Sequence, residues 1–283
     1  MEKYYRRYKI IAEPFNPEIL SSILWEVDIK GISEEDNFLY VFASYDSKVN
    51  CDLIIKQLNK LKTEDLVENF TVKEKIIKNK NWNEEWEKNL KVVKISDRIV
   101  IKPSFKEYEK KGDELVITID PKMSFGTGEH TTTRLVTLML EKHLQKGDRV
   151  LDVGSGTGIL SIAAVKLGAK SALAIDNDDW CYKNGKENCL LNDVVDKIEI
   201  RNCEIAEVGE KDFSLIISNI QKNVLEEIAI EFKKRIKENG TLILSGILEG
   251  DKDEMVKYYS AFGFKLIDSM QTDEWISLVY KSE

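Results

Sequence analysis

Hydrophobic and polar positions follow different patterns in the two parts of the chain. From residue 1 to about residue 62, strand-like stretches such as YKIIAEP alternate with helix-like stretches such as NPEILSSILWEV. Short strands mixed with two amphipathic helices predict a small α+β domain of the ferredoxin-like type over residues 1–65. Asn16 fits the cap of the first helix, and Pro17 fits its first position.

A charged segment over residues 66–90 follows this domain and contains neither glycine nor proline. This composition predicts an exposed, partly helical linker rather than a flexible tether. Trp82 and Trp86 are four positions apart and would share one face of such a helix. Packing against the next domain is the preferred interpretation for these two rings, and a binding platform is the alternative.

From residue 91 to residue 283, strand and helix patterns alternate. Aliphatic runs such as RVLDV, SALAID, FSLIISN and TLILSGI predict strands, and a single helix is predicted over KNVLEEIAIEFKKRIKENG, residues 222–240. Such alternation predicts a doubly wound α/β domain with a mostly parallel sheet. The last two strand patterns are separated only by QTDE, which is too short for a parallel crossover. The final strand is therefore expected to run antiparallel to its neighbour.

Length and charge limit the classes of function. The 283 residues are enough for two domains, and 42% of them are hydrophobic. The formal net charge of −8 argues against a broad basic surface for nucleic acid, and we expect no sequence-specific binding of nucleic acid. The stretch KYYRRYKI interleaves aromatic and basic residues and is interpreted as an amphipathic strand. Contact between this strand and ribosomal RNA or a protein partner stays open.

Other compositional signals point to a cytoplasmic protein. No apolar stretch approaches the roughly 20 residues that span a bilayer, and no long apolar region follows the first charges, so we expect no membrane partner. The four cysteines show no C-x-x-C spacing, and the chain has only two histidines. Neither a disulfide framework nor a metal site is expected.

A loop with three glycines, GSGTG at residues 154–158, follows the strand RVLDV. The third glycine comes one residue earlier than in the G-x-G-x-x-G fingerprint for a pyrophosphate. Asp152 precedes the loop, where it suits a sulfonium cation and would repel a pyrophosphate. Asp176 ends the next strand and can accept hydrogen bonds from both hydroxyls of a ribose. With Asn219 at the end of the fourth strand, the pattern predicts S-adenosylmethionine, and the alternative is a tight turn beside a helix cap.

A second motif, DPKMSFGTGEHTTTRL at residues 120–135, precedes an amphipathic helix. Glycines on both sides of Thr127 predict a segment that closes over a ligand. The alternative is a plain helix N-terminus capped by Thr131 or Thr132, and the two interpretations are compatible. His130 is a candidate general base, although a structural hydrogen-bonded role is the preferred interpretation.

These motifs, together with IDND, SNI, LSGIL and DEW, resemble the ribosomal protein L11 methyltransferase family, PrmA, over about residues 80–283. The resemblance implies an enzyme that uses S-adenosylmethionine to methylate lysine side chains and the α-amino group of ribosomal protein L11. It also implies that the first domain recognises the substrate. The cofactor contacts of the family fall here on Thr133, Gly154, Asp176 and Asn219. The other candidate cofactor-binding residues are Phe125, Gly126, Asp152, Gly156 and Asn177.

The expected reaction is a direct displacement in which a neutral amine attacks the sulfonium methyl. Because a lysine amine has a pKa of about 10.4, the site must favour the free base by desolvation. Thr127, the backbone at Gly126 and the amide of Asn219 are the candidates that position the amine. Two other readings stay open: a methyltransferase with another protein or a small molecule as substrate, and an inactive cofactor-binding module. A monomer is expected.

Overall fold

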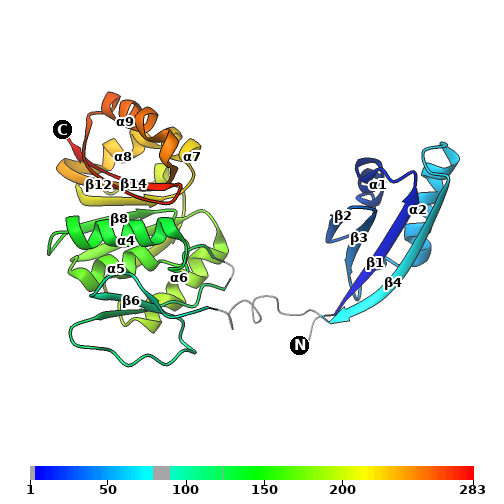
Figure 1. Ribbon diagram of the computed structural model, residues 1–283, viewed down its shortest axis with the longest axis horizontal. Coiled ribbons are helices and arrows are strands. Elements are labelled where there is room, and N and C mark those ends of the chain that lie inside the picture. The colour runs from blue at the N-terminus through cyan, green and yellow to red at the C-terminus, as the bar shows by residue number, and fades with distance from the viewer. Residues whose placement is uncertain (1–3, 79–89, 123) are drawn as a thin grey trace. The chain divides into compact units, whose positions relative to one another are not determined.

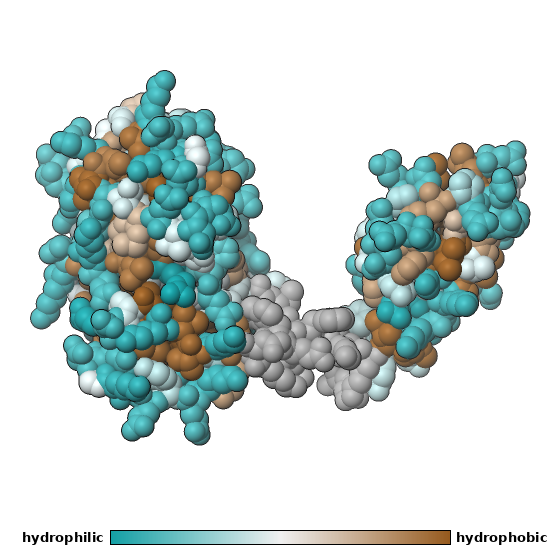
Figure 2. Space-filling model, viewed as in Figure 1, coloured by the Kyte–Doolittle hydropathy of each residue, from teal (hydrophilic) through white to brown (hydrophobic). Residues whose placement is uncertain are grey.

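The computed structural model describes residues 4–78, 90–122 and 124–283. The chain divides into two compact units, Met1–Trp82 and Asn83–Glu283. The predicted helix that carries Trp82 and Trp86 lies outside the described residues. Figure 2 shows that hydrophilic residues cover most of the visible surface of each unit, with smaller hydrophobic patches between them.

The N-terminal unit is an antiparallel four-stranded sheet with two helices. Its strands lie in the order β2-β3-β1-β4, and every neighbouring pair is antiparallel. This arrangement is the ferredoxin-like split βαβ topology that the sequence pattern predicts. The elements, visible in Figure 1, are β1 (Tyr4–Glu13), α1 (Pro17–Leu24), β2 (Gly31–Glu35), β3 (Phe38–Ser44), α2 (Cys51–Thr63) and β4 (Asn69–Lys78).

One face of this sheet carries the hydrophobic core of the unit. Tyr8, Ile10 and Ala12 alternate along β1 and are buried against side chains from both helices. Asn16 caps α1 as predicted, since its side chain accepts a hydrogen bond from the backbone N–H of Ile19. The two helices therefore cover one face of the sheet.

Strand β4 corrects the predicted linker. Residues 69–78 form a strand that pairs with β1 at ten successive positions, so the unit continues well beyond residue 65. Phe70 and Val72 pack against the core, whereas Thr71 and Lys73 are exposed. The alternation of a strand was therefore present, but the high charge of this segment concealed it.

The C-terminal unit contains a seven-stranded sheet in the order β10-β9-β8-β11-β12-β14-β13. The first five strands are parallel, and β14 is antiparallel to both of its neighbours, which confirms the expected reversal. The elements are β8 (Arg149–Val153), α5 (Ile159–Leu167), β9 (Ser171–Asp176), α6 (Asp179–Leu191), β10 (Ile198–Asn202), β11 (Phe213–Asn219), α7 (Lys222–Glu227), α8 (Ala229–Arg235), β12 (Ile236–Leu248), α9 (Lys252–Ala261), β13 (Phe264–Thr272) and β14 (Trp275–Ser282).

Helices cover both faces of this sheet. Side chains of α4 (Thr131–His143), α5 and α6 form one core, and side chains of α7, α8 and α9 form the other. A smaller sheet precedes α4 and consists of β5 (Val93–Lys94), β6 (Ile99–Lys102) and β7 (Leu115–Thr118). With both faces buried, the ends of the parallel strands are where the sheet can meet a ligand.

The single helix predicted over residues 222–240 is wrong. Two short helices, α7 and α8, occupy its first part, and β12 begins at Ile236. Arg235 is buried, and its guanidinium donates to the backbone carbonyls of Val208 and Ala206. These bonds hold the chain where the helix ends, and the residues after it join the sheet. Among the described residues, no helix is long and apolar enough to cross a membrane.

Candidate active site

Three strand ends lie side by side at the carboxyl edge of the large sheet. Strand β8 lies between β9 and β11, with Val153 level with both Ile175 and Ser218. The next residues along these strands are the glycine loop at 154–158, Asp176 and Asn219. Parallel pairing therefore brings together the three groups that the sequence placed at strand ends.

The glycine loop needs its glycines for two reasons. Gly154 and Gly156 have φ values of +73° and +54°, which other residues rarely adopt. A Cβ at Gly156 would lie 2.3 Å from the carbonyl oxygen of Phe125, and one at Gly154 would lie 2.4 Å from the side chain of Ile220. The bare backbone is thus required for packing within the chain, in addition to any approach by a ligand.

Asp176 is held at the edge of the loop. One carboxylate oxygen accepts a hydrogen bond from the N–H of Gly156 at 2.9 Å, and the other accepts one from the N–H of Asp178 at 3.0 Å. The side chain remains partly exposed, and the neighbouring Asn177 is exposed. Each carboxylate oxygen has a further lone pair, so an oriented acceptor pair is available for a diol.

Asp152 lies two residues before Gly154, and its contact with a ligand stays a prediction. Its side chain is fully buried, and one oxygen accepts hydrogen bonds from both the N–H and the hydroxyl of Ser161. Its other oxygen has no partner among the described residues. Burial, opposed by the Ser161 hydrogen bonds and aided by the charge of Asp176, raises the pKa of Asp152 to about 7. One oxygen of the carboxyl group therefore holds the first turn of α5, and the other is left without a partner among the described residues.

The motif upstream of α4 is bonded to the glycine loop. The N–H of Thr157 donates to the carbonyl of Phe125 at 2.9 Å, and the hydroxyl of Thr157 donates to the carbonyl of Gly126 at 2.8 Å. The hydroxyl of Thr127 accepts a hydrogen bond from the N–H of Glu129. Residues 125–128 therefore lie directly against the loop, and their motion as a lid stays a prediction.

His130, rather than Thr131 or Thr132, caps helix α4. Its Nδ1 accepts the backbone N–H of Thr132 at 3.3 Å and lies 2.8 Å from the hydroxyl of the same residue. The imidazole takes this role because it follows the loop in extended conformation, one residue before the helix begins. This structural use of Nδ1 agrees with the preferred interpretation of His130.

Sequence reasoning assigned no role to Trp275, the first residue of β14. Its ring lies 5.4 Å from the ring of His130, which in turn lies 5.2 Å from the ring of Phe125. Phe125 is 55% exposed, so this aromatic row reaches the surface. The motif DEW contains this tryptophan, but only the antiparallel direction of β14 explains why it reaches the same edge as Asn219.

Buried polar atoms without partners gather in the same segments. Among the described residues, four buried atoms at this edge lack a hydrogen-bond partner: Thr133 Oγ1, Asp152 Oδ1, Ser155 Oγ and Asn219 Oδ1. Such atoms destabilise the fold unless water or a ligand pairs with them. The residues at this edge therefore fit a ligand rich in polar groups, as an adenosine joined to an amino acid would be.

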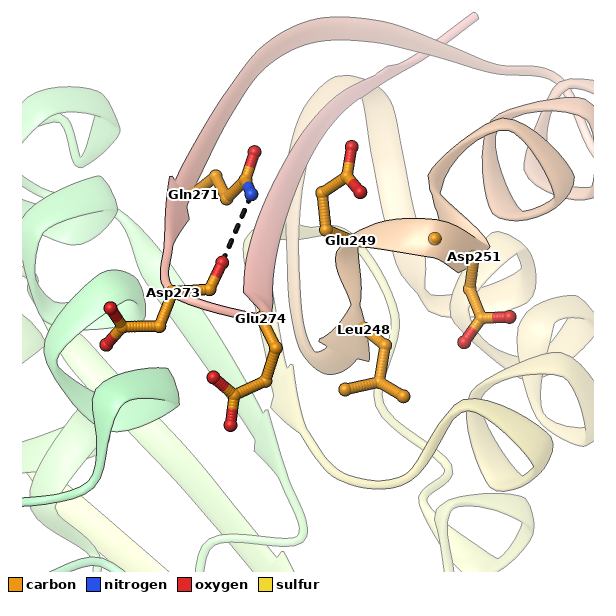
Figure 3. Close-up of a pocket in the computed structure, with 7 residues that line it drawn as sticks. Leu248, Glu249, Asp251, Gln271, Asp273 and Glu274 are labelled. Carbon is orange, nitrogen blue, oxygen red and sulfur yellow. Dashed lines mark hydrogen bonds between the residues drawn. The ribbon is translucent and has the colours of Figure 1, made fainter.

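A pocket of about 340 Å³ lies where β12 ends and β13 turns into β14 (Figure 3). Its lining includes the acidic residues Glu249, Asp251, Asp273 and Glu274. None of the predicted cofactor-binding residues lines it. Lys222 lies 2.9 Å from Asp251 and compensates part of this charge.

The fold and the residues at the carboxyl edge of the large sheet together define a class I methyltransferase. The features of this class are the parallel strands, the antiparallel pair β13–β14, the glycine loop after β8 and the acidic Asp176 at the end of β9. The chain belongs to the ribosomal protein L11 methyltransferase (PrmA) family, whose model matches residues 18–283. The resemblance inferred over residues 80–283 is confirmed and extends into the N-terminal unit.

Individual relatives agree with this assignment. The chain is 35% identical over 269 residues to a ribosomal protein L11 methyltransferase from Chlorobaculum tepidum, covering 92% of this chain and 90% of the relative. It is 36% identical over 207 residues to one from Ruminiclostridium cellulolyticum, covering 72% of this chain and 66% of the relative. The crystal structure of a ribosomal protein L11 methylase from Lactobacillus delbrueckii subsp. bulgaricus matches with a TM-score of 0.64 and 32% identity, over 68% of this chain and 99% of that one.

Proposed function

We propose that this protein transfers methyl groups from S-adenosylmethionine to the lysine side chains and the N-terminal amine of ribosomal protein L11. The observation that carries the proposal is the convergence of Asp176, the glycine loop and Asn219 at one sheet edge. Family membership and the names of the relatives support the choice of substrate. The N-terminal unit is the proposed substrate-recognition domain.

Each part of the donor has a proposed partner in the chain. Asp176 would hold the ribose hydroxyls, with Asn177 beside it, since its carboxylate is already oriented by two backbone N–H groups. Gly154 and Gly156 would lie against the amino-acid end of the donor. Thr133, Phe125, Gly126 and Asn219 would complete the site. When bound, S-adenosylmethionine supplies a methyl group on a positively charged sulfur.

The residues of the edge are suited to hold a neutral amine. The unpartnered Oδ1 of Asn219 is a hydrogen-bond acceptor, and the Gly126 carbonyl has a second lone pair beyond its bond to Thr157. Acceptors of this kind orient an amine by its N–H groups and leave the nitrogen lone pair free to attack. The hydroxyl of Thr127 is the third proposed contact. Exclusion of water by residues 125–128 would favour the uncharged form of the amine.

The test uses purified protein, donor labelled on its methyl group, and purified L11. We expect label on L11 lysines and on its N-terminal amine, and no label when these amines are chemically blocked beforehand. A ribosomal protein extract in the same assay reports other substrates. Donor binding without label on L11, or label mainly on another protein, would contradict the proposed substrate.

The variant Asp176→Ala tests the donor site separately. Loss of a charged hydrogen-bond acceptor should weaken donor binding by roughly 10- to 100-fold in calorimetry. Asp179→Ala is the matched control, because Asp179 is exposed on α6 and pairs only with Lys183 among the described residues. Equal donor affinity in the Asp176→Ala variant and the parent protein would contradict this site.

A further inference from the structure

The N-terminal sheet has a second face with a composition unlike that of a solvated surface. Helices α1 and α2 pack on the side of Tyr8, Leu39 and Val41. Side chains alternate along a strand, so Phe38, Tyr40 and Phe42 of β3 point to the opposite side. No described residue of this unit forms a layer over that side. We call this side the open face.

The three rings of the open face form a row along one central strand. The rings of Phe38 and Tyr40 are 5.0 Å apart with an angle of 75° between them, and those of Tyr40 and Phe42 are 6.4 Å apart. All three side chains are half-buried. Side chains two positions apart in a strand repeat at about 6.6 Å, so the row offers a series of flat apolar surfaces.

Positive charges lie on and beside these rings. The guanidinium of Arg7 lies 4.2 Å from the centre of the Tyr40 ring, and the ammonium of Lys9 lies 3.7 Å from the centre of the Phe38 ring. On the next strand, Lys75 is level with Arg7 and Lys73 is level with Lys9, and both lysines are exposed. Two adjacent strands thus place four cations in a compact group.

These four cations have no carboxylate partner among the described residues, whereas Arg6, Lys30 and Lys60 of the same unit do. Arg6 pairs with Glu74, and Lys60 pairs with Glu26, both away from the open face. Two acidic residues share this face with the rings: Glu35 on the edge strand, level with Phe38, and Glu13 at the end of β1. The open face is therefore locally basic, although the whole chain carries a net charge of −8.

We propose that the open face binds single-stranded RNA without strong sequence preference. Four-stranded sheets of the same βαββαβ order bind RNA by stacking unpaired bases on aromatic side chains of the central strands. Here the central strands are β3 and β1, which carry the rings and two of the cations. Bases would stack on the row of rings, and phosphates would pair with Arg7, Lys9, Lys73 and Lys75. An acidic protein segment would use the charges but leave the aromatic row without a role.

The experiment measures binding of the full-length protein to a fluorescein-labelled single-stranded RNA of eight nucleotides by fluorescence anisotropy over a series of salt concentrations. We expect log Kd to rise with log salt with a slope of roughly 2 to 3, as three or four phosphate contacts predict. The same RNA annealed to its complement should bind more weakly, because its paired bases cannot stack on the rings.

Two variants separate stacking from charge. Tyr40→Ala should weaken RNA binding by roughly 5- to 100-fold, the effect of losing one base–ring stack. The double variant Lys73→Gln/Lys75→Gln changes only exposed side chains and should reduce the salt slope by about 1.4. Its matched control, Lys56→Gln/Lys62→Gln, removes the same charge from exposed positions on α2, which covers the other face.

Three results would overturn the proposal: no binding of the single strand at low salt, equal binding of single-stranded and double-stranded RNA, or equal losses in the two lysine double variants. The last result would show that only general charge matters. The outcome is independent of the proposed methyl transfer, because the measurement needs neither donor nor L11.

Discussion

The two sheets of this protein present their side chains to ligands in opposite ways. The seven-stranded sheet is covered on both faces by helices, and its candidate site lies at the ends of β8, β9 and β11. The four-stranded sheet has both helices on one face, and its candidate surface is the other face. One unit offers the edge of a sheet, and the other offers the face of a sheet.

Strand direction explains this difference. Neighbouring parallel strands need crossover connections, which place helices on both faces of the large sheet and leave loops at its carboxyl edge. Antiparallel strands can be joined by short turns, as β2 and β3 are, so a small sheet can leave one face uncovered. The edge suits a small molecule held by backbone groups and single side chains, whereas the face suits an extended polymer.

The largest expected effect is at Asp152, which supports the edge from inside the fold. Its pKa in the folded protein is about 7, above its ordinary value of 3.8, so the folded state favours the protonated carboxyl group. The stabilisation from this proton is complete below about pH 4 and is lost as the pH rises through 7. The variant Asp152→Asn keeps a hydrogen-bond acceptor for Ser161. Its amide cannot ionise, so the variant does not lose this stability as the pH rises. The unfolding free energy of the variant relative to wild type should rise by about 4 kcal/mol between pH 4 and pH 8.

Denaturant unfolding at a series of pH values measures this difference. Asp196→Asn is the control, because Asp196 is an exposed aspartate in the turn before β10. A difference between Asp152→Asn and wild type that stays flat with pH would show that the carboxyl group is ionised in the fold.

The next effect is at Gly156, where the edge meets residues 125–128. An alanine there would combine a φ of +54° with a contact of 2.3 Å to the carbonyl oxygen of Phe125. We expect a loss of about 3 kcal/mol in stability, together with weaker donor binding. Gly209→Ala is the control, since a Cβ at that position meets nothing within 4 Å. Thermal unfolding measures the stability of both variants, and calorimetry measures their donor affinity. Equal values for Gly156→Ala and Gly209→Ala would contradict the packing argument.

A smaller effect is expected at His130. His130→Ala removes the cap of α4 and should cost about 1 kcal/mol of stability, and methyl transfer at saturating donor should fall by less than about ten-fold. His130→Asn retains a capping acceptor and should recover most of the stability. A collapse of methyl transfer by several orders of magnitude in both variants would instead identify His130 as an essential base.

The smallest expected effect tests whether the open face of the small sheet and the donor site of the large sheet are independent. Tyr40→Ala should change donor affinity by less than about two-fold, because every proposed donor contact lies in the C-terminal unit. Calorimetry with S-adenosylmethionine measures this directly. A larger loss would show that the open face and the donor site act together, and the comparison between edge and face would then fail.

The sequence predicted the large sheet well because its parallel strands are buried on both faces. Runs such as FSLIISN in β11, which is buried at five of its seven positions, therefore contain consecutive apolar residues and are easy to recognise. The same logic located Asp176 and Asn219, since a polar residue at the end of such a run must lie at the carboxyl edge. The last reversal was also predictable, because QTDE allows only an antiparallel connection.

The features that the sequence did not predict depend on contacts between distant parts of the chain. Strand β4 was missed because its exposed alternate positions are charged, and only pairing with β1 organises them as a strand. The two hydrogen bonds to the buried Asp152 come from Ser161, nine positions further along the chain. Capping by His130 depends on the extended backbone before α4. The position of Trp275 depends on the direction of a strand formed more than 100 residues downstream of His130.

The antiparallel course of β14 has a consequence for the synthesis of the protein. Trp275 begins the final strand and meets His130, and the same strand pairs with both β12 and β13. A ribosome that has produced residues 1–274 has already synthesised every residue proposed to contact the donor. Trp275 and the rest of β14, which lies between β12 and β13, are still missing at that point. The nascent chain therefore cannot complete this edge of the sheet until β14 has been synthesised and has paired between β12 and β13.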